Sequence, residues 1–124
     1  SAQIKERLTL DKLNKKIRAE IKLQDVQLKF LQTHKTFQAI NFLQRNRNKA
    51  SGLLFIPTSW ARTNYTVLET INLIEIKTSV VYFEEPYNFG TNENESIIQG
   101  ENIKPFTGQP VSSCIEGLKR FLNK

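Results

Sequence analysis

Residues 3 to 47 contain neither glycine nor proline, and this run constrains the chain more than any other feature of its sequence. The segment is rich in Leu, Lys, Gln, Glu and Ile, which are tolerable or good helix formers. It predicts one helix of about 45 residues, which would be roughly 65 Å long at the α-helical rise. A helix of that length cannot be hidden in a chain of 124 residues. Most of it must project, so an apolar stripe on it needs a partner.

Two apolar stripes run along this expected helix. One has heptad-like spacing with a single irregular step, and it contains Leu13, Ile17, Ile21, Gln24, Leu28 and Leu31. The other is a regular heptad seam of Leu23, Val26, Phe30, Thr33, Phe37 and Ile40. We expect one stripe to meet a partner helix while the other packs on the chain's own β domain. A helical hairpin within the chain is the alternative, but no turn signal interrupts residues 3–47. The predicted partner-binding residues are Leu10, Leu13, Ile17, Ile21, Leu28, Leu31, Phe30, Phe37 and Ile40.

Shorter elements are expected after residue 49. Basic residues over 45–49 suit the negative end of a helix dipole, and Ala50-Ser51-Gly52 then gives a break. Apolar and β-branched runs predict strands over 53–56, 65–76 and 78–83, a loop over 59–64, and a short edge strand at 97–98.

The chain ends in a predicted short helix. Ser112 and Ser113 are candidate N-caps, and they precede apolar residues at helical spacing. The predicted fold class is therefore α+β: a long N-terminal coiled-coil helix, a small antiparallel β domain and a short C-terminal helix. Two domains follow, a dimerisation helix over 1–49 and a β-rich domain over 50–124.

The charge of the chain is unevenly placed. The net charge is +6. Residues 1–49 hold 12 Lys/Arg against 4 Asp/Glu, a net of +8, so residues 50–124 carry −2. A basic helix can approach nucleic acid, an acidic partner or anionic lipid. The alternative, which we favour, is the solvated outer face of a coiled coil. No apolar run is long enough to span a membrane.

The inventory of catalytic groups is thin. His34 is the only histidine and falls inside the expected helix, so it cannot build a metal site alone. Cys114 is the only cysteine, and a structural role in the last helix is favoured over a reactive one. Glu84 and Glu85 should point to opposite faces of a strand. Trp60 is either a lid on the core or a recognition residue. We therefore predict no catalytic, cofactor or metal site, and no enzymatic activity.

The helix end and the strands together resemble the coiled-coil and marked-box region of the DP (dimerisation partner) family of transcription factors. The segments that carry the resemblance are Gln44-Arg45-Asn46-Arg47 at the helix end, the strand with Phe55, Thr66-Val67, Tyr82-Phe83 with Pro86-Tyr87, and Ser113 to Lys119. The connection at Pro57-Thr58 and the segment Asn88-Phe89-Gly90 depart from the family pattern.

That resemblance implies a heterodimerisation module. It would pair with an E-two-F-type protein through the helix and β domain, and the joint surface would bind a retinoblastoma-type pocket protein. It implies a nuclear location, and DNA contact only through a winged-helix domain outside this sequence. Two alternatives share the expected architecture. One is a coiled-coil structural subunit of a kinetochore-like complex, and the other is a pilin-like extracellular subunit, which glycans at the sequons of Asn64 and Asn94 would favour.

Overall fold

The protein is described by a computed structural model that covers residues 10–21, 27–87 and 92–122. Its helices are α1 (Leu10–Ile21), α2 (Thr36–Asn46), α3 (Trp60–Thr63), α4 (Tyr65–Ile74) and α5 (Pro110–Leu122), with a 3-10 turn η1 (Glu93–Glu95). Its strands are β1 (Leu53–Phe55), β2 (Thr78–Phe83) and β3 (Ile103–Gly108). None of the helices in the described part of the chain is long and apolar enough to cross a membrane.

The three strands form one parallel sheet in the order β1-β2-β3. Leu53 is paired with Thr78 at one end of the β1–β2 ladder, and Thr78 with Ile103 in the β2–β3 ladder. The expected antiparallel sheet is therefore wrong. Parallel neighbours need a crossover that returns the chain to the same edge. Here α3 and α4 make the first crossover, and a largely non-helical segment with η1 makes the second.

The central strand is buried along its whole length. All six residues of β2 are buried, and their side chains alternate between the two faces of the sheet. Val81 and Phe83 join one hydrophobic cluster, while Val80 and Tyr82 join another. A strand that is apolar on both faces requires cover on both faces.

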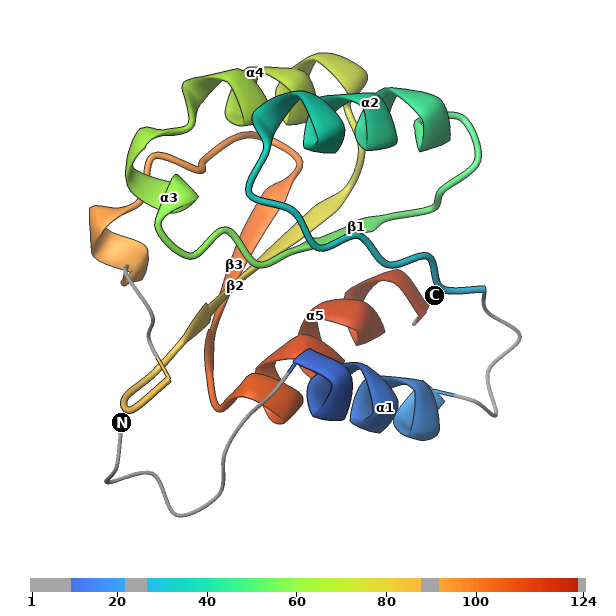
Figure 1. The fold of residues 1–124 in the computed structure, drawn as a ribbon, viewed down its shortest axis with the longest axis vertical. Helices are drawn as coiled ribbons and strands as arrows, with labels where there is room; N and C mark the ends of the chain where they lie inside the picture. Colours follow the sequence, from blue (N-terminus) through green and yellow to red (C-terminus); the bar gives the residue numbers. More distant parts are fainter. Residues whose placement is uncertain (1–9, 22–26, 88–91, 123–124) are drawn as a thin grey trace.

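Helices supply that cover in two layers, as Figure 1 shows. One face carries α1 and α5 side by side, and α5 contacts all three strands. The other face carries α2 and α4, which pack on each other. α5 approaches the sheet closely at Gly117, where an added Cβ would lie 2.7 Å from a methyl carbon of Leu54. The architecture is a three-layer α/β sandwich, and the predicted α+β class is wrong.

The prediction of a single long N-terminal helix is also wrong. α1 ends at Ile21, residues 22–26 lie outside the described part, and residues 27–35 form no helix or strand before α2 begins at Thr36. α1 and α2 lie on opposite faces of the sheet (Figure 1). They therefore cannot be parts of one straight helix. The side chains of Val26, Leu28 and Phe30 alternate with polar ones, a pattern that suits extended chain equally well.

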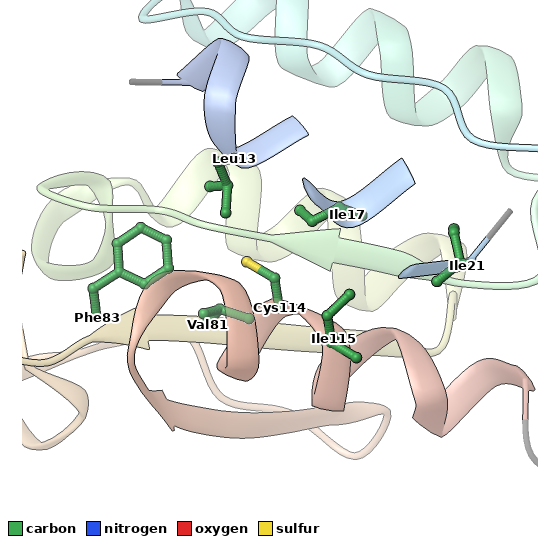
Figure 2. Packing of buried hydrophobic residues seen from close by; sticks show 7 residues of the cluster. All are labelled: Leu13, Ile17, Ile21, Val81, Phe83, Cys114 and Ile115. Carbon is green, nitrogen blue, oxygen red and sulfur yellow. The ribbon is translucent and has the colours of Figure 1, made fainter. Parts of the chain in front are cut away.

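The stripe assigned to a partner helix lies largely in the chain's own core. Leu13, Ile17 and Ile21 are buried in one cluster with residues of β2 and α5, and Figure 2 shows the three side chains directed toward Val81, Cys114 and Ile115. The remaining residues of the two stripes lie in different environments. Leu28 packs on that cluster, Ile40 packs on a second cluster, and Phe30, Leu31 and Phe37 are exposed. Leu10 is the first residue of α1.

The strand expected over 65–76 is helix α4 instead. Its buried residues Val67, Thr70 and Ile71, together with the partly buried Ile74, follow helical spacing toward the α2 side. Asn64 caps the helix, because its side-chain oxygen accepts a hydrogen bond from the Val67 amide at 3.0 Å. The many β-branched residues favoured a strand, but the packing position of the segment in the fold overrides this propensity.

Of the other local expectations, some are confirmed and some are wrong. The strands expected over 53–56 and 78–83 are β1 and β2, and the final helix is α5, which begins at Pro110. The expected loop over 59–64 contains α3, and residues 97–98 are not in a strand. Helices from residues 1–49 and strands from 50–124 share hydrophobic clusters. The division of the chain after residue 49 into separate domains stays a prediction.

Replacing Ile17 by Asp tests the placement of α1. Ile17 is 3% exposed, so the change puts a carboxylate into an apolar core. We expect it to lower the free energy of unfolding by ~3 kcal/mol or more. Urea denaturation followed by circular dichroism measures this. The matched control is Leu73→Asp on α4, where the side chain is 72% exposed and the loss should be below about 1 kcal/mol. Equal, small effects at both positions would contradict this placement.

Candidate active site at the carboxyl edge of the sheet

The carboxyl ends of the parallel strands are where an open α/β sheet places a ligand. The connections that follow β1, β2 and β3 leave the sheet at this edge, and α2, α4 and α5 begin on the same side of the molecule (Figure 1). Helix N-termini favour negative charge because their first amides lack intrahelical partners. The candidate site is therefore built from these connections.

The turn after β1 has strained backbone. Thr58 has a φ of 50°, in the left-handed region that β-branched residues rarely adopt. It is preceded by the buried Pro57 and followed by Ser59, and its carbonyl accepts a hydrogen bond from the Ala61 amide at 3.1 Å. Thr58 and Ser59 are both exposed. Strain of this kind persists only where the surroundings enforce it, and it is concentrated at functional sites.

A hydrogen bond joins the start of α2 to the start of α4. The Asn64 side-chain nitrogen donates to the Thr36 hydroxyl at 3.0 Å. His34 and Arg62 each lie two residues from one partner of this bond, and both are exposed. Arg62 makes no ion pair with any described residue. The only imidazole of the chain and a free guanidinium are therefore held on the same side of the sheet as the Thr58 turn.

Two carboxylates follow β2. The Glu84 amide donates to the Gly108 carbonyl at 3.0 Å, and the Gln109 side-chain amide donates to the Glu84 carboxylate at 3.1 Å. Ser113 in turn donates its hydroxyl to the Gln109 carbonyl at 2.6 Å. Glu84 is thus held against the start of α5, whereas Glu85 is exposed and forms no such bond within the described residues.

An open cleft of about 990 Å³ adjoins these carboxylates. It lies between β2 and β3 and the segment that connects them, and Glu84, Glu85 and Glu93 are part of its wall. Its apolar wall includes Ile98 and Ile103. Glu93 accepts a hydrogen bond from the Thr107 hydroxyl at 3.2 Å. Among the described residues, no three His, Cys, Asp or Glu side chains are arranged to hold a metal ion.

Two further titratable groups lie in the core rather than at the carboxyl edge of the sheet. Burial raises the pKa of Tyr82, with a smaller opposing effect of its 2.6 Å hydrogen bond to the Ser96 hydroxyl. Burial also raises the pKa of the Cys114 thiol from 9.0 to about 12. Cys114 is completely buried, and Figure 2 shows its sulfur directed toward α1. The structural role expected for Cys114 is confirmed.

Comparison with known families decides which kind of protein this is. A family model described as dehydroquinase class II matches residues 2–122. The chain belongs to the class II dehydroquinase family. This is a family of 3-dehydroquinate dehydratases, enzymes of the shikimate and quinate pathway. The three-layer sheet is consistent with its flavodoxin-like fold. A search of curated proteins found no match.

Family membership overturns the functional expectations drawn from the sequence. The resemblance to DP transcription factors is wrong, and with it the heterodimer with an E-two-F-type protein, the pocket-protein surface and the winged-helix partner domain. The expectation of no enzymatic activity is wrong for a family of enzymes. The nuclear location and the role of Phe30, Leu31 and Phe37 in partner binding stay predictions.

Sequence reasoning missed most of the groups at the carboxyl edge. It placed His34 inside a helix, whereas the structure places it in a bend before α2. It assigned residues 59–64 to a loop and gave Arg62 and Asn64 no role. The available signal was the run Pro57-Thr58-Ser59 directly after an apolar strand, which is typical of a strand-to-helix turn. Trp60, for which a core lid was the favoured of two readings, packs against the cluster that contains Val67 and Ile71.

The burial of Cys114 predicts low thiol reactivity and a pH dependence of stability. The folded chain keeps the thiol proton up to about pH 12, whereas an unfolded chain loses it above 9.0. The stabilisation of the folded chain by its buried, protonated thiol is therefore complete below pH 9. It is lost as the pH rises toward 12. We expect a disulfide reagent at pH 8 to label the native chain at less than about a tenth of the denatured rate. The control is Cys114→Ala, which has no thiol to titrate and should therefore lack this loss of stability at alkaline pH. Rapid native labelling would contradict the burial.

Proposed function

We propose that this chain dehydrates a hydroxylated cyclic ketone that carries a carboxylate, of the 3-dehydroquinate type, at the carboxyl edge of its sheet. The observation that carries the proposal is the strained Thr58 turn next to a free guanidinium, in a chain whose family match spans residues 2–122. Strain in that turn presents the Thr58 and Ser59 hydroxyls together with Arg62 at the end of β1.

Each group has a chemical role in the proposed site. Arg62 would bind the substrate carboxylate, because a guanidinium forms charge-assisted hydrogen bonds with two carboxylate oxygens. The hydroxyls of Thr58 and Ser59 would bind ring hydroxyls. Glu85 and His34 are exposed, and they would act as the base and the acid of the proposed proton transfers.

The reaction is a proton transfer coupled to loss of water. A base removes a proton from the carbon next to the ketone, and the electron pair of that C–H bond forms a C=C bond. The C–O bond to the leaving hydroxyl breaks, and that oxygen takes a proton from an acid and departs as water. Nothing is oxidised or reduced. The amides at the starts of α2 and α4 favour the negative charge that develops on the ketone oxygen.

Replacing Arg62 by Gln tests the proposed carboxylate site. Loss of a charge-assisted hydrogen bond costs about 1.5–3 kcal/mol, so kcat/KM should fall roughly 10- to 150-fold, mainly through KM. Formation of the conjugated enone is followed by ultraviolet absorbance. Replacing His34 by Gln should instead lower kcat, by about 100-fold or more.

The matched control is Lys104→Gln, which removes one exposed positive charge from β3. It should leave both kinetic constants within about twofold. Absence of dehydration by the intact protein would overturn the proposed function, and so would an Arg62→Gln variant with the KM of the unaltered chain.

A further inference from the structure

Positive charge gathers on the side of the molecule opposite the candidate active site. We call this set of side chains the basic edge; it comprises Arg45, Arg47, Lys49, Lys77, Lys119 and Arg120. They come from the end of α2, the start of β2 and the last turn of α5, which meet at the amino ends of the strands (Figure 1). Glu75 and Glu101 are acidic residues at this edge, and Glu20 lies in the last turn of α1, which ends on the same side (Figure 1). The six cations thus outnumber these three carboxylates.

The cations of the basic edge are not neutralised by ion pairs. Within residues 10–21, 27–87 and 92–122, Arg45, Lys49 and Lys77 have no ion-pair partner. Arg47 donates to the Gln44 side chain at 3.1 Å, a neutral acceptor. Arg120 donates to the Thr78 carbonyl and, at 3.4 Å, to the Asn102 carbonyl, which fixes its guanidinium at the amino ends of the strands. The charge is therefore available to an external anion.

Helix stability does not account for the whole edge. Cations in a last helical turn complement the dipole, and this explains Arg45, Lys119 and Arg120. Lys49 and Lys77 lie outside the helices. The opposite edge holds Glu84, Glu85, Glu93 and Glu95 beside few cations. The chain is thus electrically polarised along its strands, and a polarised field of this kind attracts a polyanion.

The neighbours of these cations fit a nucleic acid strand. Asn46 and Asn48 alternate with the arginines, and the Lys29 ammonium donates to the Asn46 side chain at 3.1 Å. The Phe121 ring lies next to Gly52, with the Arg120 guanidinium 6.0 Å from its centroid. Amides and aromatic or guanidinium planes bind unstacked bases, while cations bind phosphates.

Single-stranded RNA fits this edge better than duplex DNA or a membrane. A major-groove reader presents the side of a helix or a β-ribbon, whereas α2 and α5 present their C-terminal ends here. An anionic bilayer takes up cations together with a continuous exposed apolar surface. At this edge Phe121 of α5 is only partly exposed against Gly52, and the exposed Leu73 lies on α4, over the opposite face of the sheet. We propose that the basic edge binds single-stranded RNA through its phosphates, independently of the candidate active site.

The test compares two double variants of equal charge. Arg45→Gln with Arg47→Gln removes two cations from the basic edge, and Lys15→Gln with Lys104→Gln removes two exposed cations elsewhere. Fluorescence anisotropy of a labelled mixed-sequence RNA of about 12 nucleotides, a length within the range of single-strand binding sites, measures affinity across a salt series. We expect the first variant to bind tenfold or more weakly, with a slope of log K against log salt reduced by roughly 1.4, twice the 0.7 released per phosphate contact.

The control variant should bind within about twofold of the unaltered chain. Equal losses in both variants would show that only net charge matters and would overturn the assignment. Tighter binding to vesicles containing phosphatidylserine, or to a DNA duplex, would overturn the choice of RNA. No RNA binding at tens of micromolar would overturn the proposal altogether. If circular dichroism shows that the arginine variant is not folded, Lys49→Gln with Lys77→Gln takes its place. The same loss of RNA affinity is expected.

Discussion

The burial of β2 on both faces is the constraint on which the rest of the structure depends. Its six residues are all buried, and no polar side chain faces solvent from either side of that strand. Apolar burial contributes about 25 cal/mol per Å², so leaving one face of such a strand open would forfeit several kcal/mol. α1 and α2 therefore cannot be parts of one free rod. α1 covers one face of the sheet and α2 covers the other.

The sequence predicts those parts of the fold that local patterns determine. Two strands and the last helix follow from short apolar runs and a helical stripe, and the structure confirms them as β1, β2 and α5. The errors occur where two patterns coincide. Residues 65–74 are rich in β-branched side chains and also have helical spacing, and the requirement for a parallel crossover selects the helix. Leu13, Ile17 and Ile21 have the spacing of a dimer seam, which is also the spacing of a helix packed on its own sheet.

The candidate site could not be assembled from the sequence because its members come from separate connections. His34, Arg62 and Glu85 are brought to one edge only when the strands are parallel and aligned. The same alignment places the ends of α2 and α5 at the other edge, where the cations of the basic edge gather. The polarity of the parallel sheet thus separates a region suited to small-molecule chemistry from a region suited to a polyanion.

The central claim is that α1 belongs to the core of its own chain, and methyl nuclear Overhauser effects test it most directly. Leu13, Ile17 and Ile21 share a cluster with Val81 and Ile115. The account predicts methyl cross-peaks between these two groups of residues, with intensities per labelled chain unchanged when labelled protein is diluted into an excess of unlabelled protein. Cross-peaks that disappear on dilution would place the stripe at an interface between chains. Their absence at every dilution would remove α1 from the sheet, and either result would contradict the account.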